Sequence, residues 1–339
     1  MSNVPGSDIQ NTRPSTQVAL SRVGVTGLKR ILRLNSPRKN ARTGDRVHGT
    51  LFFADVDLFA DLVATQSGVH MSRFLENMEE AAGEISAEVS PDIETLAERM
   101  ALSIARTQGA KRSEVRIRAQ FPMTKTTPKS GVSVEDLYTF IGVAVSDGSS
   151  TRRAIGVEVS GLTVCPCARE MVAEDSRAKL LAAGYEARQA EEILSMLPLA
   201  SHNQRGLGTL IVGTERPVGA EELVKIVESS MSSEIYELLK RPDELEVVRN
   251  AHMKPRFVED VVREMIGSVV REMPELSGDT FVMARQENFE SIHTHNAFAE
   301  RGGLLGEMRA ELAGIPQNAP TGKTDKRYRS LESWLDSLM

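Results

Sequence analysis

Cysteine is scarce in this chain, since Cys165 and Cys167 are the only two among 339 residues. Two thiols so close in sequence cannot build the network of cross-links on which small secreted scaffolds depend, which excludes a disulfide-stapled fold. A chain of this length has enough core to fold without staples, and it predicts two domains or two repeated modules. The scarcity of cysteine also indicates a reducing compartment, and we expect a cytoplasmic protein.

Long apolar runs and an excess of positive charge are also missing. No stretch reaches the roughly 18 consecutive apolar residues of a membrane span, and the polar start, Met1 to Pro14, lacks the apolar core of a signal peptide. The 47 acidic residues outnumber the 41 basic ones, giving a net charge of -6. We therefore expect neither a membrane nor a nucleic-acid partner.

Alternating and helical apolar patterns in the first half predict the element order ββααββ. Residues 1–16 are rich in Ser, Asn, Thr and Pro, and they predict an extended N-terminal arm. Two helices are expected in this half, one opening at 68–74 with Ser72 as its N-cap and one starting at Ser90. The expected strands are 18–34, 47–58, 114–121 and 137–146.

The second half repeats the order, which predicts an α+β fold of two tandem modules, each an antiparallel sheet covered on one face by a helix pair. The expected strands are 154–164, 206–213 and 279–285, and the expected helices are 221–239 and 255–270. Residues 168–198 have helical spacing and read as an insertion. The resulting boundaries are 1–16 for the arm, 17–150 and 151–315 for the modules, and 316–339 for a linker and C-terminal helix.

The segments Val164–Cys167 and Ser201–Gly206 carry the most distinctive chemistry. A thiolate is a strong ligand for borderline-soft metals, and imidazole is its commonest partner, so Cys165 and His202 form a candidate metal pair. Pro166 restricts Cys165 to extended conformations, which prevents the two thiols from lying on one helical face. The alternative is that both cysteines are buried structural residues.

Further candidates follow predicted strands and helix ends. The stretch Asn288–His295 follows a strand, and its His293-x-His295 spacing directs both rings to one side if the chain is extended. Glu244 lies in an acid pair after a helix stop, and Glu259 lies at the positive end of a helix. For each acid the alternative is a solvated surface carboxylate. His252 stands beside no other candidate, and we interpret it as structural.

Taken together, these motifs resemble the type IB GTP cyclohydrolases. The resemblance rests on Cys165–Cys167, Ser201–Gly206, Lys240–Glu244, Phe257–Asp260 and Asn288–His295, and it covers nearly all of residues 8–310 in order. It implies the tunnelling fold, whose repeating module is ββααββ and whose antiparallel sheets close into barrels between subunits. The resemblance also implies GTP as the substrate. Barrels shared between subunits imply a homodimer or larger homo-oligomer.

The spacing between the metal-ligand segments resembles the archaeal MptA branch of that family. His202 lies 35 positions after Cys167, whereas the histidine segment follows the cysteines more closely in the bacterial folate-type enzymes. This branch implies an Fe²⁺ cofactor, with Zn²⁺ or Mn²⁺ as alternatives, and a 7,8-dihydroneopterin 2′,3′-cyclic phosphate product on the way to methanopterin. The folate-type alternative gives 7,8-dihydroneopterin triphosphate, and the choice rests on similarity alone.

The resemblance also assigns roles to individual residues. The metal ligands fall on Cys165, His202, Glu244 and His293, and the guanine-anchoring acid falls on Glu259. Glu290 is a further active-site acid that, like His295, can transfer protons, and Cys167 is expected beside Cys165. The triphosphate requires cations, for which the candidates are Arg73, Lys125, Arg205 and Lys240.

Two rival functions remain open from the sequence. The first is a nitrile reductase of the same fold, which attacks a pterin-like base with a nucleophilic cysteine and uses NADPH. That chemistry needs a thiolate but no metal, and two candidate histidine ligands disfavour it. The second is a non-catalytic protein that binds a metal or a purine.

Overall fold

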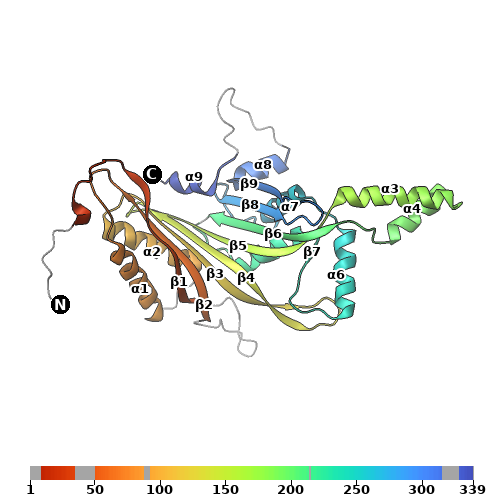
Figure 1. Cartoon of the computed structure of the whole chain (residues 1–339), viewed down its shortest axis with the longest axis horizontal. Coiled ribbons are helices and arrows are strands. Elements are labelled where there is room, and N and C mark those ends of the chain that lie inside the picture. The colour runs from red at the N-terminus through yellow and green to blue at the C-terminus, as the bar shows by residue number, and fades with distance from the viewer. Residues whose placement is uncertain (1–8, 35–49, 88–91, 214, 315–327, 339) are drawn as a thin grey trace, which may run out of the picture.

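The computed structural model describes residues 9–34, 50–87, 92–213, 215–314 and 328–338. Within these residues one sheet of nine strands runs through the molecule in the order β1-β2-β3-β4-β5-β6-β8-β9, with β7 paired to β5 (Figure 1). The strands are β1 (Leu20–Leu34), β2 (Thr50–Leu62), β3 (Ser113–Thr126), β4 (Ser133–Ser146), β5 (Thr151–Val164), β6 (Asn203–Gly213), β7 (Ser233–Glu234), β8 (Phe281–Asn288) and β9 (Ala297–Leu304). The helices are η1 (Ile9–Asn11), α1 (Met71–Ala87), α2 (Ile93–Gln108), α3 (Pro166–Ala182), α4 (Ala187–Met196), α5 (Ala220–Ser230), α6 (Arg241–Met253), α7 (Val258–Glu272), α8 (Leu305–Leu312) and α9 (Leu331–Asp336).

Every pairing between described strands is antiparallel. The expected α+β class, with an antiparallel sheet and helices packed against it, is therefore confirmed. The first half has the element order ββααββ, and the second half contains β5, β6, α5, α7, β8 and β9 with α3–α4 and β7–α6 added. None of the described helices combines the length and the apolar character needed to cross a bilayer.

Alternation along the strands gives the sheet two apolar faces. The main core lies on the face covered by α1, α2, α5 and α7, and on β4 it receives Phe140 and Ala144. The intervening residues Ile141, Val143 and Val145 point to the other face, where they join a second cluster with α9. Both faces near the middle of the sheet are therefore covered within one chain.

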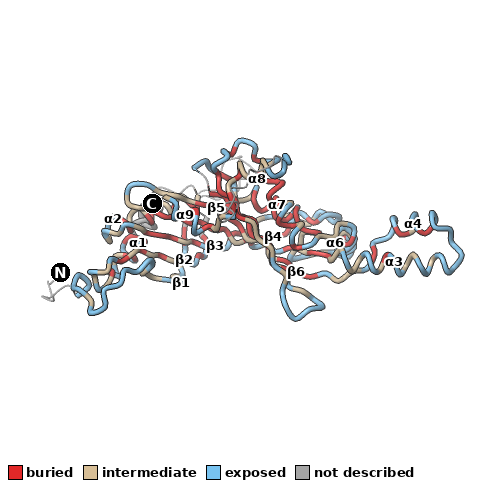
Figure 2. The backbone as a smooth tube through the Cα atoms, turned by 90° about the horizontal axis from the view of Figure 1, so that it is seen from above, coloured by how far each residue is buried: buried red, intermediate tan, exposed pale blue. Residues whose placement is uncertain are grey.

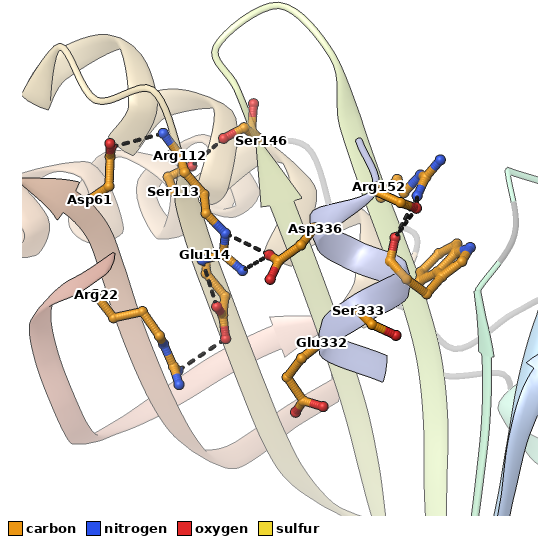
Figure 3. Close-up of polar contacts among 12 residues, drawn as sticks. Arg22, Asp61, Arg112, Ser113, Glu114, Ser146, Arg152, Glu332, Ser333 and Asp336 are labelled. Carbon is orange, nitrogen blue, oxygen red and sulfur yellow. Dashed lines mark hydrogen bonds and ion pairs between the residues drawn. The ribbon is translucent and has the colours of Figure 1, made fainter. Parts of the chain in front are cut away.

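Helix α9 docks on the second face through one aromatic stack and two ion pairs. The ring of Trp334 stacks on Phe281 with centroids 5.1 Å apart. Asp336 lies 2.7 Å from the Arg112 guanidinium, and Glu332 lies 3.3 Å from that of Arg116. Figure 3 shows α9 lying across the strands with Asp336 directed at Arg112. A helix of this length has no stability of its own, so these contacts hold it in place.

Helices α3 and α4 form a hairpin that projects from one end of the sheet (Figure 1). This hairpin is called the arm from here on, and it is distinct from the N-terminal arm expected over residues 1–16. Figure 2 shows that most of its residues are exposed, unlike those of the sheet. The arm has a small apolar cluster of its own, formed by Ala173, Leu194 and Leu199 and separate from the main core. An ion pair between Arg177 and Glu191 joins its two helices.

Several element boundaries differ from the sequence predictions. Ser72 is not an N-cap, because α1 begins one residue earlier at Met71. The helix expected over 221–239 ends at Ser230, because the next residues form β7 against β5. Helices α6 and α8 and strand β9 were not predicted. The expected helix start at Ser90, the first residues of the strand expected over 47–58, and most of the linker in 316–339 lie outside the described residues.

Candidate active site

Cys165 joins strand β5 to the arm. It is the N-cap of α3, with extended φ and ψ of −69° and 120°, as Pro166 at the next position predicts. Its Sγ accepts a hydrogen bond from the Ala168 N–H at 3.5 Å. Its own N–H donates to the carbonyl of His202 at 3.1 Å, and the Ser201 hydroxyl donates to the Cys165 carbonyl at 2.7 Å. The two candidate ligand segments are thus joined directly at the base of the arm.

His202 stands at the start of β6 with only 13% of its side chain exposed. Its Nδ1 lies 3.1 Å from Oε1 of Gln204 and 3.6 Å from Oε2 of Glu290. Both neighbours engage the same ring nitrogen. The opposite nitrogen, Nε2, is therefore the one left for a ligand.

Glu290 follows strand β8, and its side chain is 10% exposed. Its Oε1 accepts from the Gln204 amide nitrogen at 3.4 Å. Its Oε2 is buried and has no hydrogen-bond partner in the described part of the chain. A buried carboxylate oxygen without a donor is costly, and such atoms are typical of sites that bind a ligand or transfer a proton.

The turn after β8 brings two more histidines to this end of the sheet. The ring of His293 lies edge-on to that of His202, with centroids 6.2 Å apart, and His295 stacks on His293 at 5.2 Å. Both are exposed. The residues gathered where β5 and β8 end and β6 begins are therefore Cys165, His202, Glu290, His293 and His295.

The donor chemistry of this group fits a transition metal, because it combines a thiol, an imidazole with its Nε2 available and a neighbouring imidazole. The geometry within one chain is less complete. Among the described residues, no three His, Cys, Asp or Glu side chains converge closely enough to hold a metal ion. The four-ligand set therefore stays a prediction, with Cys165 and His202 as its best-placed members.

Glu259 lies at the start of α7, whose approach segment contacts β5 beside this group, whereas Glu244 lies at the start of α6, next to the turn between β3 and β4. Glu244 is exposed in the first turn of α6, so the acid pair opens a helix and does not follow one. The neighbouring Asp243 is structural: although burial raises its pKa, hydrogen bonds from Ser130, Lys129 and Lys240 hold that pKa well below its usual range. Glu259 is exposed in the first turn of α7, as predicted. The segment that leads into α7 is held against the end of β5, because Arg256 N–H donates to the Val164 carbonyl at 3.0 Å.

The structure separates the four cations proposed for the triphosphate. Arg205 and Lys240 are exposed, on β6 and at the start of α6. Arg73 belongs to α1, at the opposite end of the sheet from the arm (Figure 1), and donates to the Thr107 carbonyl at 3.2 Å.

Lys125 is held in a buried network, with its ammonium 2.6 Å from Glu228 and 2.9 Å from Glu234. Burial raises the pKa of Glu228, although the charge of Lys125 opposes that rise. Because its charge is already neutralised by these acids, Lys125 is poorly suited to bind phosphate within one chain.

Two of the remaining sequence assignments can be placed directly. Cys167 is exposed in the first turn of α3, and its role beside Cys165 stays a prediction. His252 is buried, and its Nδ1 lies 3.1 Å from the Leu199 carbonyl. The interpretation of His252 as a structural residue is therefore confirmed.

Sequence reasoning missed Gln204 and Thr163. Gln204 is buried on β6 and contacts both His202 and Glu290, while Thr163 anchors its amide at 3.1 Å. A signal was present in the sequence. Gln204 follows His202 by two positions, and in a strand this spacing places both side chains on the same face.

Known proteins resemble this chain over most of its length. A family model described as type I GTP cyclohydrolase folE2 matches residues 7–299. The chain is 40% identical over 312 residues to the GTP cyclohydrolase MptA of Methanobrevibacter smithii, covering 90% of this chain and 97% of that protein. It is 42% identical over 312 residues to the protein of that name from Methanothermobacter thermautotrophicus, covering 90% and 95%. Among solved structures, uricase from Arthrobacter globiformis aligns with a TM-score of 0.47 at 8% identity, covering 90% of this chain and 96% of the uricase.

Proposed function

The chain belongs to the type I GTP cyclohydrolase folE2 family, and from this premise we propose how its residues act. The protein is a GTP cyclohydrolase that hydrolyses the imidazole ring of guanine at C8 and releases that carbon as formate. The observation that carries the proposal is the direct joining of Cys165 to His202 at the base of the arm. It brings a thiol and an imidazole, the predicted ligands, to one point beside the buried carboxylate of Glu290.

We propose Cys165, His202, Glu244 and His293 as ligands of one Fe²⁺ per subunit, with Zn²⁺ or Mn²⁺ as alternatives. When bound, a divalent metal makes water nucleophilic near neutral pH, which ring opening at C8 requires. The unpartnered Oε2 of Glu290 is suited to accept a proton from that water or from the substrate. His295, stacked on His293, is a second group able to move protons during the loss of formate.

Recognition of guanine is assigned to Glu259. A carboxylate accepts two hydrogen bonds from guanine N1–H and its 2-amino group, a pattern that adenine cannot offer. Glu259 is exposed at the first turn of α7, where the helix dipole favours its charge. Arg205 and Lys240 are the remaining candidates to meet the triphosphate, because both are exposed. Arg205 lies on β6, which begins beside Cys165 and His202, whereas Lys240 precedes α6 near the turn between β3 and β4.

We propose that the chain adopts the tunnelling fold and closes its sheets into barrels between subunits. The sheet is open within one chain, since β1 and β9 each have a single neighbouring strand among the described residues. Exposed apolar side chains lie on both of these strands, including Ile31 and Phe298. A site shared between subunits would also explain why Glu244 and Arg73 face solvent or lie far from Cys165 in one chain.

We propose 7,8-dihydroneopterin 2′,3′-cyclic phosphate, an intermediate on the way to methanopterin, as the product. Two observations support the MptA branch over the folate-type branch. The relatives compared above carry the MptA name, and the arm occupies the long interval between Cys167 and His202.

The test combines elemental analysis with a formate-release assay on GTP, under anaerobic conditions. We expect about one transition metal per subunit and formate release that is lost on chelation and restored by Fe²⁺. Cys165→Ala should lose tight metal binding and activity together. A protein that stays fully active after chelation would contradict the metal mechanism, and one that consumes NADPH with a nitrile substrate would identify a reductase instead.

A further inference from the structure

A short chain of hydrogen bonds connects His202 to the interior of the sheet through Gln204. The side chain of Gln204 is 6% exposed, and that of Thr163, on the neighbouring strand β5, is fully buried. The amide oxygen of Gln204 lies 3.1 Å from His202 Nδ1. Its amide nitrogen lies 3.1 Å from Thr163 Oγ1 and 3.4 Å from Glu290 Oε1. One buried amide therefore contacts two residues of the proposed site and one anchoring hydroxyl.

The chemistry of these partners fixes the direction of each hydrogen bond. An ionised carboxylate accepts only, so the amide atom that faces Glu290 is the nitrogen. The oxygen of the same amide therefore faces His202. Because this oxygen also accepts only, Nδ1 of His202 carries the ring proton. Glu290 Oε2, at 3.6 Å from Nδ1, is too distant for a hydrogen bond, but its negative charge favours the same tautomer.

We infer that Gln204 is a positioning residue, which fixes the tautomer of His202 so that Nε2 is free to bind a metal and which holds Glu290 beside it. A neutral imidazole with its proton on Nδ1 offers its lone pair only at Nε2. Groups that orient a metal-binding histidine in this way typically change metal affinity by about 10–100-fold when they are lost. The inference rests on the proposed function, because that function makes His202 a ligand.

Thr163 gives the arrangement its rigidity. Its hydroxyl, at 3.1 Å, holds the Gln204 amide nitrogen from the side of β5. The adjacent β5 and β6 backbones are paired at Thr163 and Gln204. The amide is thus anchored on the rigid sheet, while the groups it orients stand at the sheet's end.

The test reads the tautomer directly in metal-free protein by long-range proton–nitrogen NMR, which reports on each ring nitrogen separately. The His202 signals are assigned by their loss in His202→Asn. We expect the Nδ1–H tautomer in the wild type and its loss in Gln204→Met, which has no acceptor. Gln204→Glu alone would set a second carboxylate against Glu290, so the rescue is the double variant Gln204→Glu with Glu290→Gln. It exchanges amide and carboxylate, keeps an acceptor toward Nδ1 and should restore the tautomer. The matched control is Gln286→Met, since Gln286 is a fully buried glutamine on β8 whose amide donates to Asn288.

A second measurement, Co²⁺ affinity, separates the inference from the proposed function. Gln204→Met should bind Co²⁺ about 10–100-fold more weakly than the wild type, and Gln286→Met should bind it unchanged. If Gln204→Met does not fold, Thr163→Val gives the same test in weaker form, and its Co²⁺ affinity should fall severalfold.

Two outcomes overturn the inference: a wild-type His202 protonated on Nε2, or a Gln204→Met variant that keeps both the tautomer and the Co²⁺ affinity. A wild type with the Nδ1–H tautomer, lost in Gln204→Met, that takes up no Co²⁺ supports the role of Gln204 toward His202. The absence of Co²⁺ uptake would in that case contradict the proposed metal site, and not the role of Gln204.

Discussion

Glu94, in the first turn of α2, shows how burial changes the chemistry of a single residue. It is 4% exposed, and its Oε2 has no hydrogen-bond partner in the described part of the chain. The start of α2 lies so close to β4 that a Cβ at Gly142 would be 2.6 Å from the Ile93 carbonyl oxygen. Burial is the main cause that raises the pKa of Glu94 to about 7, from an ordinary value of 4.5.

The raised pKa predicts a pH dependence of stability. The folded state holds this proton more tightly than the unfolded state, so the free energy of unfolding falls as pH rises from 4.5 to about 7 and is constant above that. Glu94→Gln should remove this slope and gain up to about 3 kcal/mol at about pH 8, with no gain below about pH 4.5. Urea unfolding of the wild type and of Glu94→Gln at both pH values measures this difference in the free energy of unfolding. Glu76→Gln, on an exposed face of α1, is the control. If the free energy of unfolding depends on pH equally in Glu94→Gln and in the wild type, the account is contradicted.

A second residue-level prediction separates recognition from metal binding. Glu259→Gln places a donor against the donors of guanine, which should cost roughly 2–4 kcal/mol in transition-state binding and leave the metal content unchanged. Glu244→Gln should weaken metal retention first. Elemental analysis and GTP binding under anaerobic conditions compare the two variants. A Glu259→Gln protein that loses metal but still binds GTP would show that the two glutamates have been exchanged.

Single residues also show where sequence reasoning is reliable. The extended conformation of Cys165 was predictable, because Pro166 imposes it locally. The burial of Lys125 beside Glu228 and Glu234 was not, because those partners lie more than 100 positions away in the chain. No local pattern marks a lysine whose charge is neutralised by distant strands and helices.

At the scale of elements, docking of α9 can be followed by fluorescence, because Trp334 is the only tryptophan in the chain. Leu335 is fully buried in the same cluster. Leu335→Asp should release α9, shift the emission of Trp334 to longer wavelength and lower the free energy of unfolding by about 2–5 kcal/mol. Leu312→Asp, at an exposed leucine of α8, is the control. An unchanged emission maximum in Leu335→Asp would contradict docking through this face.

The same scale shows why some helices were predicted and others missed. In α2, Ile93, Leu96, Met100 and Ile104 are all buried at helical spacing, so the periodic pattern was visible. In α6 the apolar residues Leu245 and Val248 are exposed, and the helix has little apolar periodicity to detect. The predicted end of α5 was too late because pairing of Ser233 and Glu234 with β5 overrides local helix propensity.

At the scale of the whole molecule, the open sheet predicts self-assembly through its edge strands. We expect a homodimer or larger species in sedimentation velocity. Ile31→Lys on β1 and Phe298→Lys on β9 should weaken assembly and lower turnover, because charges on an edge strand oppose pairing. Leu312→Lys is the control, since Leu312 is as exposed as these two residues but lies on helix α8, which offers no strand edge. A wild-type monomer with full turnover would contradict assembly through these edges.

The arm has a consequence for how freely this chain can change its length. The bonds between Cys165 and the Ser201–His202 segment join the two ends of the arm at its base. Residues 166–201 therefore form a loop already closed by other interactions, and doubling such a loop costs only about 0.6 kcal/mol in chain entropy. Segments of very different length can be accommodated here while the thiol and imidazole beneath keep their positions. Branches of one family can thus diverge at this point without rebuilding the chemistry they share.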